Sequence, residues 1–359
     1  MYDQVSAALS NQQLTQAATL LKQWQQAKPQ DPWLQLAMAN YWEAKDDLEK
    51  AQITYTRLLQ SASSSKVLRH ARDGVQRVRD QLAQRREHQI QEAKQRSDIR
   101  GSAILVLAPV LGDARQAAIA GLSEVMQLDL YTARMRIPSK HWRMFRVGAA
   151  GEIQYFWEQL QNHATPARWL TIDQIKSIPV FKVEQVQAFG PQLKVICQNT
   201  ANQKGTISLD WGEAHQWVIG QLPIFESVVE RAPWGKLKRK DMTQDYAEVI
   251  DLHLPKRGCV LRFCDRTYRY RGSAAVPGQT QTPSVSLVAA TYWKAMKALF
   301  QQYLPAPDRD FTGFGQGALD FIDLLPRFDH YLELSRQQPT DWDSAFHLYS
   351  CLHFVALTR

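Results

Sequence analysis

The sequence has few cysteines and no long apolar run, and both absences narrow the classes of protein it can belong to. The four cysteines, Cys197, Cys259, Cys264 and Cys351, form no C-x-x-C pair and no zinc-binding spacing. We therefore expect free or buried thiols in a reducing compartment. No apolar stretch reaches the roughly 20 residues of a membrane-spanning helix, and the first residues lack the pattern of a signal peptide. These features predict a cytoplasmic protein.

Catalytic signatures are also scarce. Asp343 and His347 have the i, i+4 spacing that a metal or acid–base site uses, but a capping or surface pair on a short helix explains them better. Gly313, Gly315 and Gly317 form G-x-G-x-G without a preceding strand or a closing Lys-Ser/Thr, so a phosphate loop is not favoured. We predict no catalytic residues, no cofactor and no metal; an enzyme site assembled from distant residues is the least favoured alternative.

An internal repeat is the strongest pattern present. Residues 11–17 and 45–51 are similar at an offset of 34 residues, which is the length of a tetratricopeptide repeat. The offset pairs small residues with small and bulky residues with bulky: Ala17 with Ala51, Leu21 with Tyr55, and Trp24 with Leu58. In a helical hairpin the small residue allows close approach, and the bulky ones fill the same face. The alternative is an ordinary helical hairpin in which the two segments are similar by chance.

Tetratricopeptide-like helices are predicted over residues 1–83. Two such units seldom form a stable array alone, so a further helix starting near residues 63–66 is expected to cap them. Repeats of this class build concave surfaces that hold other proteins. We therefore predict a protein-binding groove with aromatic and basic side chains: Trp33, Tyr41, Trp42, Tyr55 and Arg57.

The net charge of +8 favours an anionic partner: an acidic protein, an anionic membrane surface or, less favoured, nucleic acid. Residues 84–100 are charged and apolar-poor, which predicts a solvated helical linker. A basic loop around one tryptophan is a candidate site for the anionic partner, and a merely solvated loop is the alternative. Its residues are Arg231, Trp234, Lys236, Lys238, Arg239 and Lys240. A second basic group surrounds Trp142: Arg134, Arg136, Lys140, Arg143 and Arg146.

The remaining chain predicts three further segments. In residues 101–190 strands alternate with helices, as in a small two-layer α/β domain similar to ferredoxin-like folds. Residues 191–304 contain seven short strand candidates and then an amphipathic helix, as in a pleckstrin-homology-like barrel. Residues 305–359 are predicted to be a C-terminal helical extension, with a Gly-rich turn at 311–314 and an apolar end that docks on the body or on a partner. The predicted fold class is therefore multidomain, α plus α+β.

Three segments carry a resemblance over nearly the whole chain. They are residues 126–134 (MQLDLYTAR), residues 243–247 with 251–255 (TQDYA, DLHLP) and residues 342–350 (WDSAFHLYS). The chain resembles a cyanobacterial family that joins N-terminal tetratricopeptide repeats to a C-terminal region without assigned activity. The resemblance implies a cytoplasmic or thylakoid-surface protein. It also implies a role in assembling photosynthetic complexes, by analogy with other cyanobacterial repeat proteins.

Two functions follow as hypotheses. The first is a non-enzymatic adaptor or assembly factor that binds a protein through the helical repeats. The alternative is a regulatory protein that binds nucleic acid through the basic helix predicted over residues 69–86 and the basic loop at 231–240.

Overall fold

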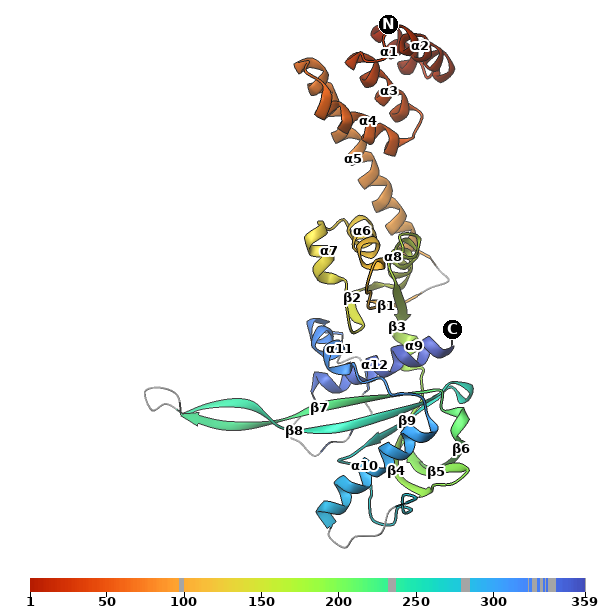
Figure 1. Cartoon of the computed structure of the whole chain (residues 1–359), viewed down its shortest axis with the longest axis vertical. Helices are drawn as coiled ribbons and strands as arrows, with labels where there is room; N and C mark the ends of the chain where they lie inside the picture. The colour runs from red at the N-terminus through yellow and green to blue at the C-terminus, as the bar shows by residue number, and fades with distance from the viewer. Residues whose placement is uncertain are drawn as a thin grey trace. The chain divides into compact units, whose positions relative to one another are not determined.

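The structure, a computed structural model, describes residues 1–96, 100–231, 237–278, 285–321, 323–324, 328–329, 332, 334 and 340–358; side chains are described for all of these except 226–231, 237–242, 285–288 and 357–358. The chain divides into two compact units, Met1–Gln95 and Arg96–Arg359 (Figure 1). The first is helical, and the second combines helices with two sheets. The predicted class of α plus α+β is therefore confirmed at this level.

Five helices form the first unit: α1 Tyr2–Ser10, α2 Leu14–Ala27, α3 Pro32–Ala44, α4 Leu48–Ser61 and α5 Ser65–Lys94. The Asp31 and Asp47 side chains cap α3 and α4, because they accept hydrogen bonds from backbone N–H groups of the first turn. All six residues paired by the 34-residue offset are buried between helices, as predicted. Helix α5 continues across the predicted boundary at residues 83 and 84, so the cap and the predicted linker share one helix.

A three-stranded antiparallel sheet begins the second unit, in the order β2-β1-β3. Its strands are β1 Ser102–Leu107, β2 Arg143–Ala149 and β3 Ala167–Thr171. The helices in this part are α6 Ala114–Met126, α7 Leu130–Arg136, α8 Ala150–Asn162 and α9 Ile172–Lys176. Helix α8 packs on all three strands, and α6 packs beside α8. The continuous apolar run of β1 is buried on both faces, which is why it lacks alternation.

The second sheet has six strands in the order β6-β5-β4-β9-β8-β7. They are β4 Val180–Ala188, β5 Gln192–Gln198, β6 Lys204–Asp210, β7 Gln216–Arg231, β8 Leu237–Leu254 and β9 Cys259–Cys264. The pairing of β4 with β9 is parallel, and the other pairings are antiparallel. Two predictions fail here. Strand β4 belongs to this sheet rather than to a separate domain at 101–190, and the strand candidates at 217–219 and 225–229 are one long strand.

Helices cover both faces of the six-stranded sheet. Helix α10 Val285–Tyr303 packs on one face around Phe300. Helices α11 Phe311–Ala318 and α12 Asp341–Thr358 pack on the other face, and their apolar side chains share one core with those of the three-stranded sheet. Figure 1 shows α12 between the two sheets. Helices α11 and α12 are thus part of a core shared by both sheets rather than an extension, and Leu352 and Phe354 near the end of α12 are buried, as expected for an end that docks.

The glycines at 313, 315 and 317 lie in helix α11, which also includes residues 311–314, where a turn was predicted. A Cβ on Gly315 would come within 2.6 Å of the Trp342 ring, and a Cβ on Gly313 would overlap His141. Glycine is therefore required at these two positions because neighbouring side chains pack directly on the helix backbone. This packing explains two of the three glycines that superficially resemble a phosphate loop, and a Cβ on Gly317 would meet only an ordinary contact.

Candidate functional site

A row of aromatic rings crosses one side of the helical unit. Tyr2 of α1 meets Trp33 of α3 edge-on, with ring centroids 4.8 Å apart, and the His70 ring of α5 lies 6.1 Å from Trp33. Helix α3 packs against both α1 and α5, which brings the three residues into line. Tyr2 and Trp33 are half-buried and His70 is exposed. Partly exposed aromatic side chains supply large contact areas at protein interfaces.

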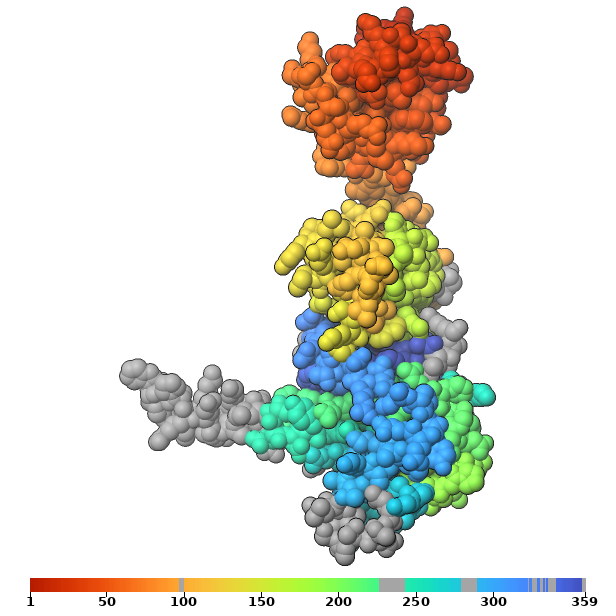
Figure 2. All heavy atoms as spheres, in the orientation of Figure 1, coloured from red at the N-terminus to blue at the C-terminus, as the bar shows by residue number. Residues whose placement is uncertain are grey.

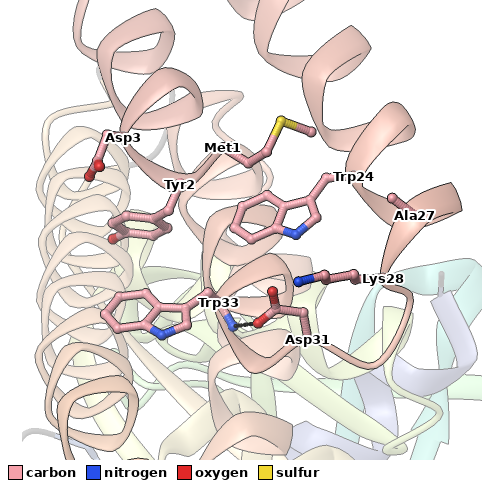
Figure 3. Close-up of a pocket in the computed structure, with 8 residues that line it drawn as sticks. All are labelled: Met1, Tyr2, Asp3, Trp24, Ala27, Lys28, Asp31 and Trp33. Atoms are coloured by element: carbon pink, nitrogen blue, oxygen red, sulfur yellow. Dashed lines mark hydrogen bonds between the residues drawn. The ribbon is translucent and has the colours of Figure 1, made fainter.

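A hollow of about 530 Å³ opens beside this row (Figure 3). Its lining mixes aromatic, apolar and charged side chains: Met1, Tyr2, Asp3, Trp24, Ala27, Lys28, Asp31 and Trp33. Asp31 Oδ1 accepts a hydrogen bond of 3.0 Å from Trp33 N, so the cap of α3 also forms part of the wall. The hollow is thus lined by aromatic and apolar side chains together with both signs of charge, which suits an amphipathic peptide segment.

A polar cluster fixes the helices beneath the aromatic row. The Tyr55 hydroxyl oxygen lies 2.5 Å from Asn40 Oδ1 and 2.6 Å from Glu43 Oε2, so its single proton can be donated to either acceptor. Arg77 donates two hydrogen bonds of 3.0 Å to the Glu43 carboxylate, and Asn40 Nδ2 donates to the Tyr2 hydroxyl at 3.4 Å. Burial, together with the hydrogen bond to Glu43, raises the pKa of Tyr55, so the hydroxyl stays protonated. The cluster ties α1, α3, α4 and α5 together, so it preorganises the face above it.

The structure brings only Tyr41 and Trp42 of the five predicted groove residues into ring contact, with centroids 5.3 Å apart. Trp33 lies in the aromatic row, whereas Trp42 lies two and a half turns later and thus on the opposite side of α3, where it contacts Lys50 of α4. Tyr41 is half-buried and packs toward the core around Trp24. Tyr55 is fully buried, which corrects its assignment as a contact residue. Arg57 is exposed, but it lies about 200° around α4 from Tyr55.

Sequence reasoning missed Tyr2 and His70. They lie on the first and last helices of the unit, where the repeated segment is absent. Tyr2 precedes Trp33 by 31 residues, and His70 follows Trp33 by 37 residues, so the 34-residue offset aligns neither with Trp33. The signal in the sequence that could have identified them is an aromatic residue near the start of each of the helices α1, α3 and α5.

The described residues of the predicted basic loop lie in strands. Residues 231 and 237–240 belong to β7 and β8, and the ladder pairs Arg231 with Leu237. Trp234 and Lys236 lie outside the described residues. For Arg231, Lys238, Arg239 and Lys240 the structure describes the backbone but no side chains. The prediction that these residues bind an anionic partner stays a prediction.

Polar groups around α12 are buried within the second unit. His253 Nε2 lies 2.9 Å from Ser350 Oγ, and burial lowers the pKa of His253 to about 3. Arg262 and Asp251 form an ion pair of 2.6 Å beside them, with both side chains almost fully buried. A serine and a neutral histidine resemble parts of a hydrolase site. Because His253 is fully buried between strand and helix, this pair connects β8 to α12 rather than facing a substrate.

Asp343 and His347 do not form a surface pair on a short helix, because α12 has 18 residues and buries both side chains. Asp343 receives hydrogen bonds from Thr340, in keeping with the predicted capping role. His347 lies near the Cys351 sulfur instead, at 3.6 Å from Nε2. Within the described part of the chain, no cluster of three or more His, Cys, Asp or Glu side chains is arranged to hold a metal ion.

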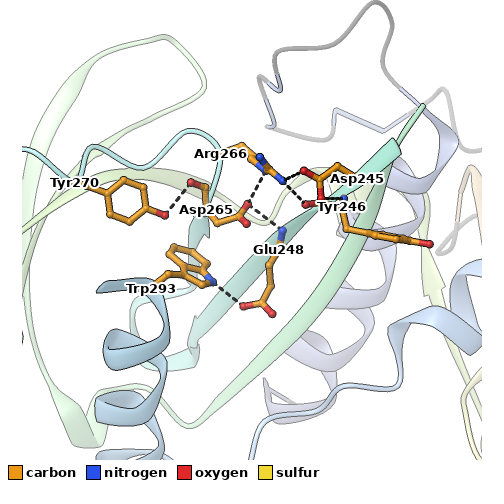
Figure 4. A network of polar contacts seen from close by, with 7 residues as sticks. All are labelled: Asp245, Tyr246, Glu248, Asp265, Arg266, Tyr270 and Trp293. Carbon is orange, nitrogen blue, oxygen red and sulfur yellow. Dashed lines mark hydrogen bonds and ion pairs between the residues drawn. The ribbon is translucent and has the colours of Figure 1, made fainter. Parts of the chain in front are cut away.

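A second polar cluster joins β8 and β9 to α10 (Figure 4). Glu248 accepts 2.6 Å contacts from Trp293 Nε1 and Lys297 Nζ, and its backbone N–H donates to Asp265 Oδ1 at 3.0 Å. Arg266 pairs with the exposed carboxylate of Asp245. Burial raises the pKa of Asp265 to about 6. Each carboxylate already has structural partners, so this cluster holds helix to sheet and is a weaker candidate than the aromatic row.

Comparisons of the chain with protein-family models, with curated proteins and with solved structures give no match. The resemblance to a cyanobacterial repeat family therefore stays a prediction. The geometry of the aromatic row and its hollow is the basis on which the function is proposed.

Proposed function

We propose that this chain is a non-enzymatic adaptor or assembly factor whose helical unit binds a segment of a partner protein. The observation that carries the proposal is the aromatic row of Tyr2, Trp33 and His70 beside a hollow of about 530 Å³. Aromatic anchors next to a concave surface are the features that dominate the energetics of protein interfaces. A role at thylakoid or photosynthetic complexes is the form of this proposal that the family resemblance favours.

We also propose three specific fold likenesses for parts of the chain. A tetratricopeptide-like assignment of α1–α5 is supported by the buried residue pairs at the 34-residue offset and by α3 packing on both α1 and α5. The alternation of strands and helices at 101–176 supports a ferredoxin-like likeness. A β-rich segment followed by α10 supports a pleckstrin-homology-like likeness, although the parallel pairing of β4 with β9 departs from a simple antiparallel barrel.

The test uses the two tryptophans of α3. In affinity capture with the full chain, Trp33→Ala should lose the proteins that the unmodified chain retains, because it removes the centre of the row. Trp42→Ala is the matched control, since it removes the same side chain from the opposite side of the same helix. Melting temperatures of both variants separate lost binding from lost folding. Equal retention of partners by both variants would contradict the proposal.

Nucleic-acid binding is the second candidate function, and a stripe on α5 favours it. Arg69, Arg72 and Arg79 are exposed at helical spacing along one side of the helix. Arg77 and Arg85 do not add to this stripe, because they pair with Glu43 and Asp46. A gel-shift series in increasing salt tests it: binding should fall steeply with salt and with Arg72→Gln plus Arg79→Gln. No shift at low salt would exclude this function.

A further inference from the structure

Exposed apolar side chains gather around helix α7 in the second unit. Leu130, Tyr131 and Met135 of α7 are 62%, 74% and 60% exposed, and Leu111 in the preceding connection is 71% exposed. On the helix, residues 130, 131, 134 and 135 lie within about 140° of one another, while Ala133 of α7 and Ile137 just after it are buried. We call Leu111, Leu130, Tyr131 and Met135 the α7 patch. Exposed apolar clusters of this kind mark interaction surfaces.

The α7 patch is held in place by backbone contacts. The Arg115 guanidinium donates to the carbonyl oxygens of Val110 and Pro138 at 3.1 Å, and of Ile137 at 2.9 Å. Val110 N donates to the same Pro138 carbonyl at 3.0 Å. These contacts fasten the segment that carries Leu111 to the end of α7. At its other end, α7 is capped by Asp129, which accepts hydrogen bonds from Thr132 N and Oγ1. The apolar side chains are thus presented by a fixed scaffold.

Cationic side chains accompany the apolar ones. They are Arg134 and Arg136 on α7, Lys140 just after it, and Arg143 at the start of β2, which donates to the Met135 carbonyl at 2.9 Å. Among the described residues, none of these four is within ion-pair distance of a carboxylate. The nearby Asp129 is occupied as the helix cap. The surface therefore combines protruding apolar groups with uncompensated positive charge.

We propose that the α7 patch docks on an anionic lipid bilayer, with Leu130, Tyr131 and Met135 entering the interface and Arg134 and Arg136 contacting lipid phosphates. Positive charge beside exposed apolar groups is the combination that such interfaces attract, and a tyrosine places its ring at the headgroup level. Figure 2 shows the residues of α7, in yellow, projecting at the surface of the second unit. Side chains that protrude fit a deformable bilayer, whereas a protein partner would need a matching cavity.

The attachment is peripheral in this proposal. Within the described residues, none of the helices combines the length and the apolar character needed to traverse a bilayer. The inference develops the expectation of an anionic partner that follows from the net charge of +8, and it is independent of the aromatic row in the helical unit.

Vesicle co-sedimentation of the full chain tests the α7 patch. The unmodified protein should bind vesicles of phosphatidylcholine mixed with phosphatidylglycerol and bind vesicles of phosphatidylcholine alone much more weakly. Combined Leu130→Ser, Tyr131→Ser and Met135→Ser should lower partitioning at least about tenfold, and Arg134→Gln with Arg136→Gln should lower it by a similar factor that added salt reproduces.

Two controls match these changes. Ile53→Ser removes an apolar side chain that is 58% exposed in the helical unit, and Arg69→Gln with Arg72→Gln removes the same charge from α5. Both should bind vesicles as the unmodified chain does, and so should Trp33→Ala, which separates this proposal from the protein-binding one. Absence of binding to anionic vesicles, or equal binding by the serine variant, would overturn the bilayer proposal. So would a serine variant that loses a captured protein while vesicle binding is unchanged.

Discussion

At the scale of single residues, burial determines which groups can change charge without unfolding the protein. His253 is fully buried beside Ser350, and this burial lowers its pKa to about 3. The neutral ring therefore stabilises the folded state above pH 6.5, the ordinary pKa of histidine, and that contribution is lost as pH falls below 6.5 toward 3. The energetic scale is about 1.4 kcal/mol per pH unit for one proton.

We expect His253→Gln to make the second unit less sensitive to acid. Urea unfolding at pH 7 and pH 5 measures the free energy of unfolding at both pH values. His215→Gln is the control, because His215 is exposed in the same unit and should leave the pH dependence unchanged. If the two variants lose stability equally on acidification, burial of the His253 ring does not govern the effect.

Asp265 predicts the opposite pH dependence. Burial raises its folded pKa to about 6 from an ordinary value of 3.8. Its contribution to stability is therefore complete below pH 3.8 and is lost as pH rises through 6. Asp265→Asn should flatten this loss between pH 4 and pH 7, by at most about 3 kcal/mol, because asparagine does not titrate. Asparagine also keeps an oxygen that can accept the hydrogen bond from the Glu248 N–H.

Asp245 is the internal comparison for Asp265. Hydrogen bonds from Tyr246 N and Arg266 lower the pKa of Asp245, so Asp245→Asn should reduce acid sensitivity rather than base sensitivity. Chemical denaturation across this pH range distinguishes the two slopes. The two variants should change the slope of unfolding free energy against pH, relative to the unmodified chain, in opposite directions. Changes of the same sign in both variants would show that the local environments in Figure 4 do not set the pH response.

At the scale of elements, the packing of α5 on α4 depends on one glycine. In an exposed helix, replacing glycine by alanine stabilises by about 1 kcal/mol. A Cβ on Gly74, however, would lie 2.5 Å from the Tyr55 ring. That ring cannot swing aside, because it is fully buried and its hydroxyl is bonded to Asn40 and Glu43. Steric overlap therefore outweighs helix propensity.

Gly74→Ala should consequently destabilise the helical unit by about 1–3 kcal/mol, as overpacked cores do. Thermal unfolding followed by circular dichroism measures the change. Arg69→Ala is the control at an exposed site on the same helix and should have little effect. An increase in melting temperature for Gly74→Ala would mean that α4 and α5 separate more easily than their contacts indicate.

The buried face of an element with a regular apolar pattern was predictable, and the position of an element buried on all sides was not. The 34-residue offset identified the buried faces of α2 and α4 because each of these helices has one apolar side. Helix α12 has no such side: residues 343–354 are all buried and include serine and histidine. Without an amphipathic period, its position between two sheets leaves no trace in the sequence. Strand pairing between segments far apart in the sequence, such as β4 with β9, also leaves no recognisable pattern in the sequence.

The candidate site was predictable only where it coincides with the repeat. Trp33 begins a helix with a clear cap and was identified as a groove residue. Tyr55 was assigned to the groove, although the 34-residue offset makes it equivalent to Leu21, which is a core position. Tyr2 and His70 join Trp33 only through the packing of α1 and α5 on α3, which residue spacing does not encode.

At the scale of the whole molecule, each of the two units has described apolar cores of its own. The cores that contain Leu36 and Trp24 use residues of α1–α5 alone. The cores that contain Phe300 and Phe346 use residues after 100 alone. Because each unit has cores of its own, we expect the two units to unfold in separate transitions.

Core truncations in each unit test this independence. Leu36→Ala and Phe300→Ala each remove a fully buried side chain and should cost about 2–5 kcal/mol in their own unit. In differential scanning calorimetry, we expect two transitions, with Leu36→Ala lowering the temperature of one and Phe300→Ala lowering the other. Ile53→Ser, at an exposed position, should move neither. If each truncation shifts both transitions by similar amounts, the units are energetically coupled, and a partner held by the helical unit would then alter the stability of the second.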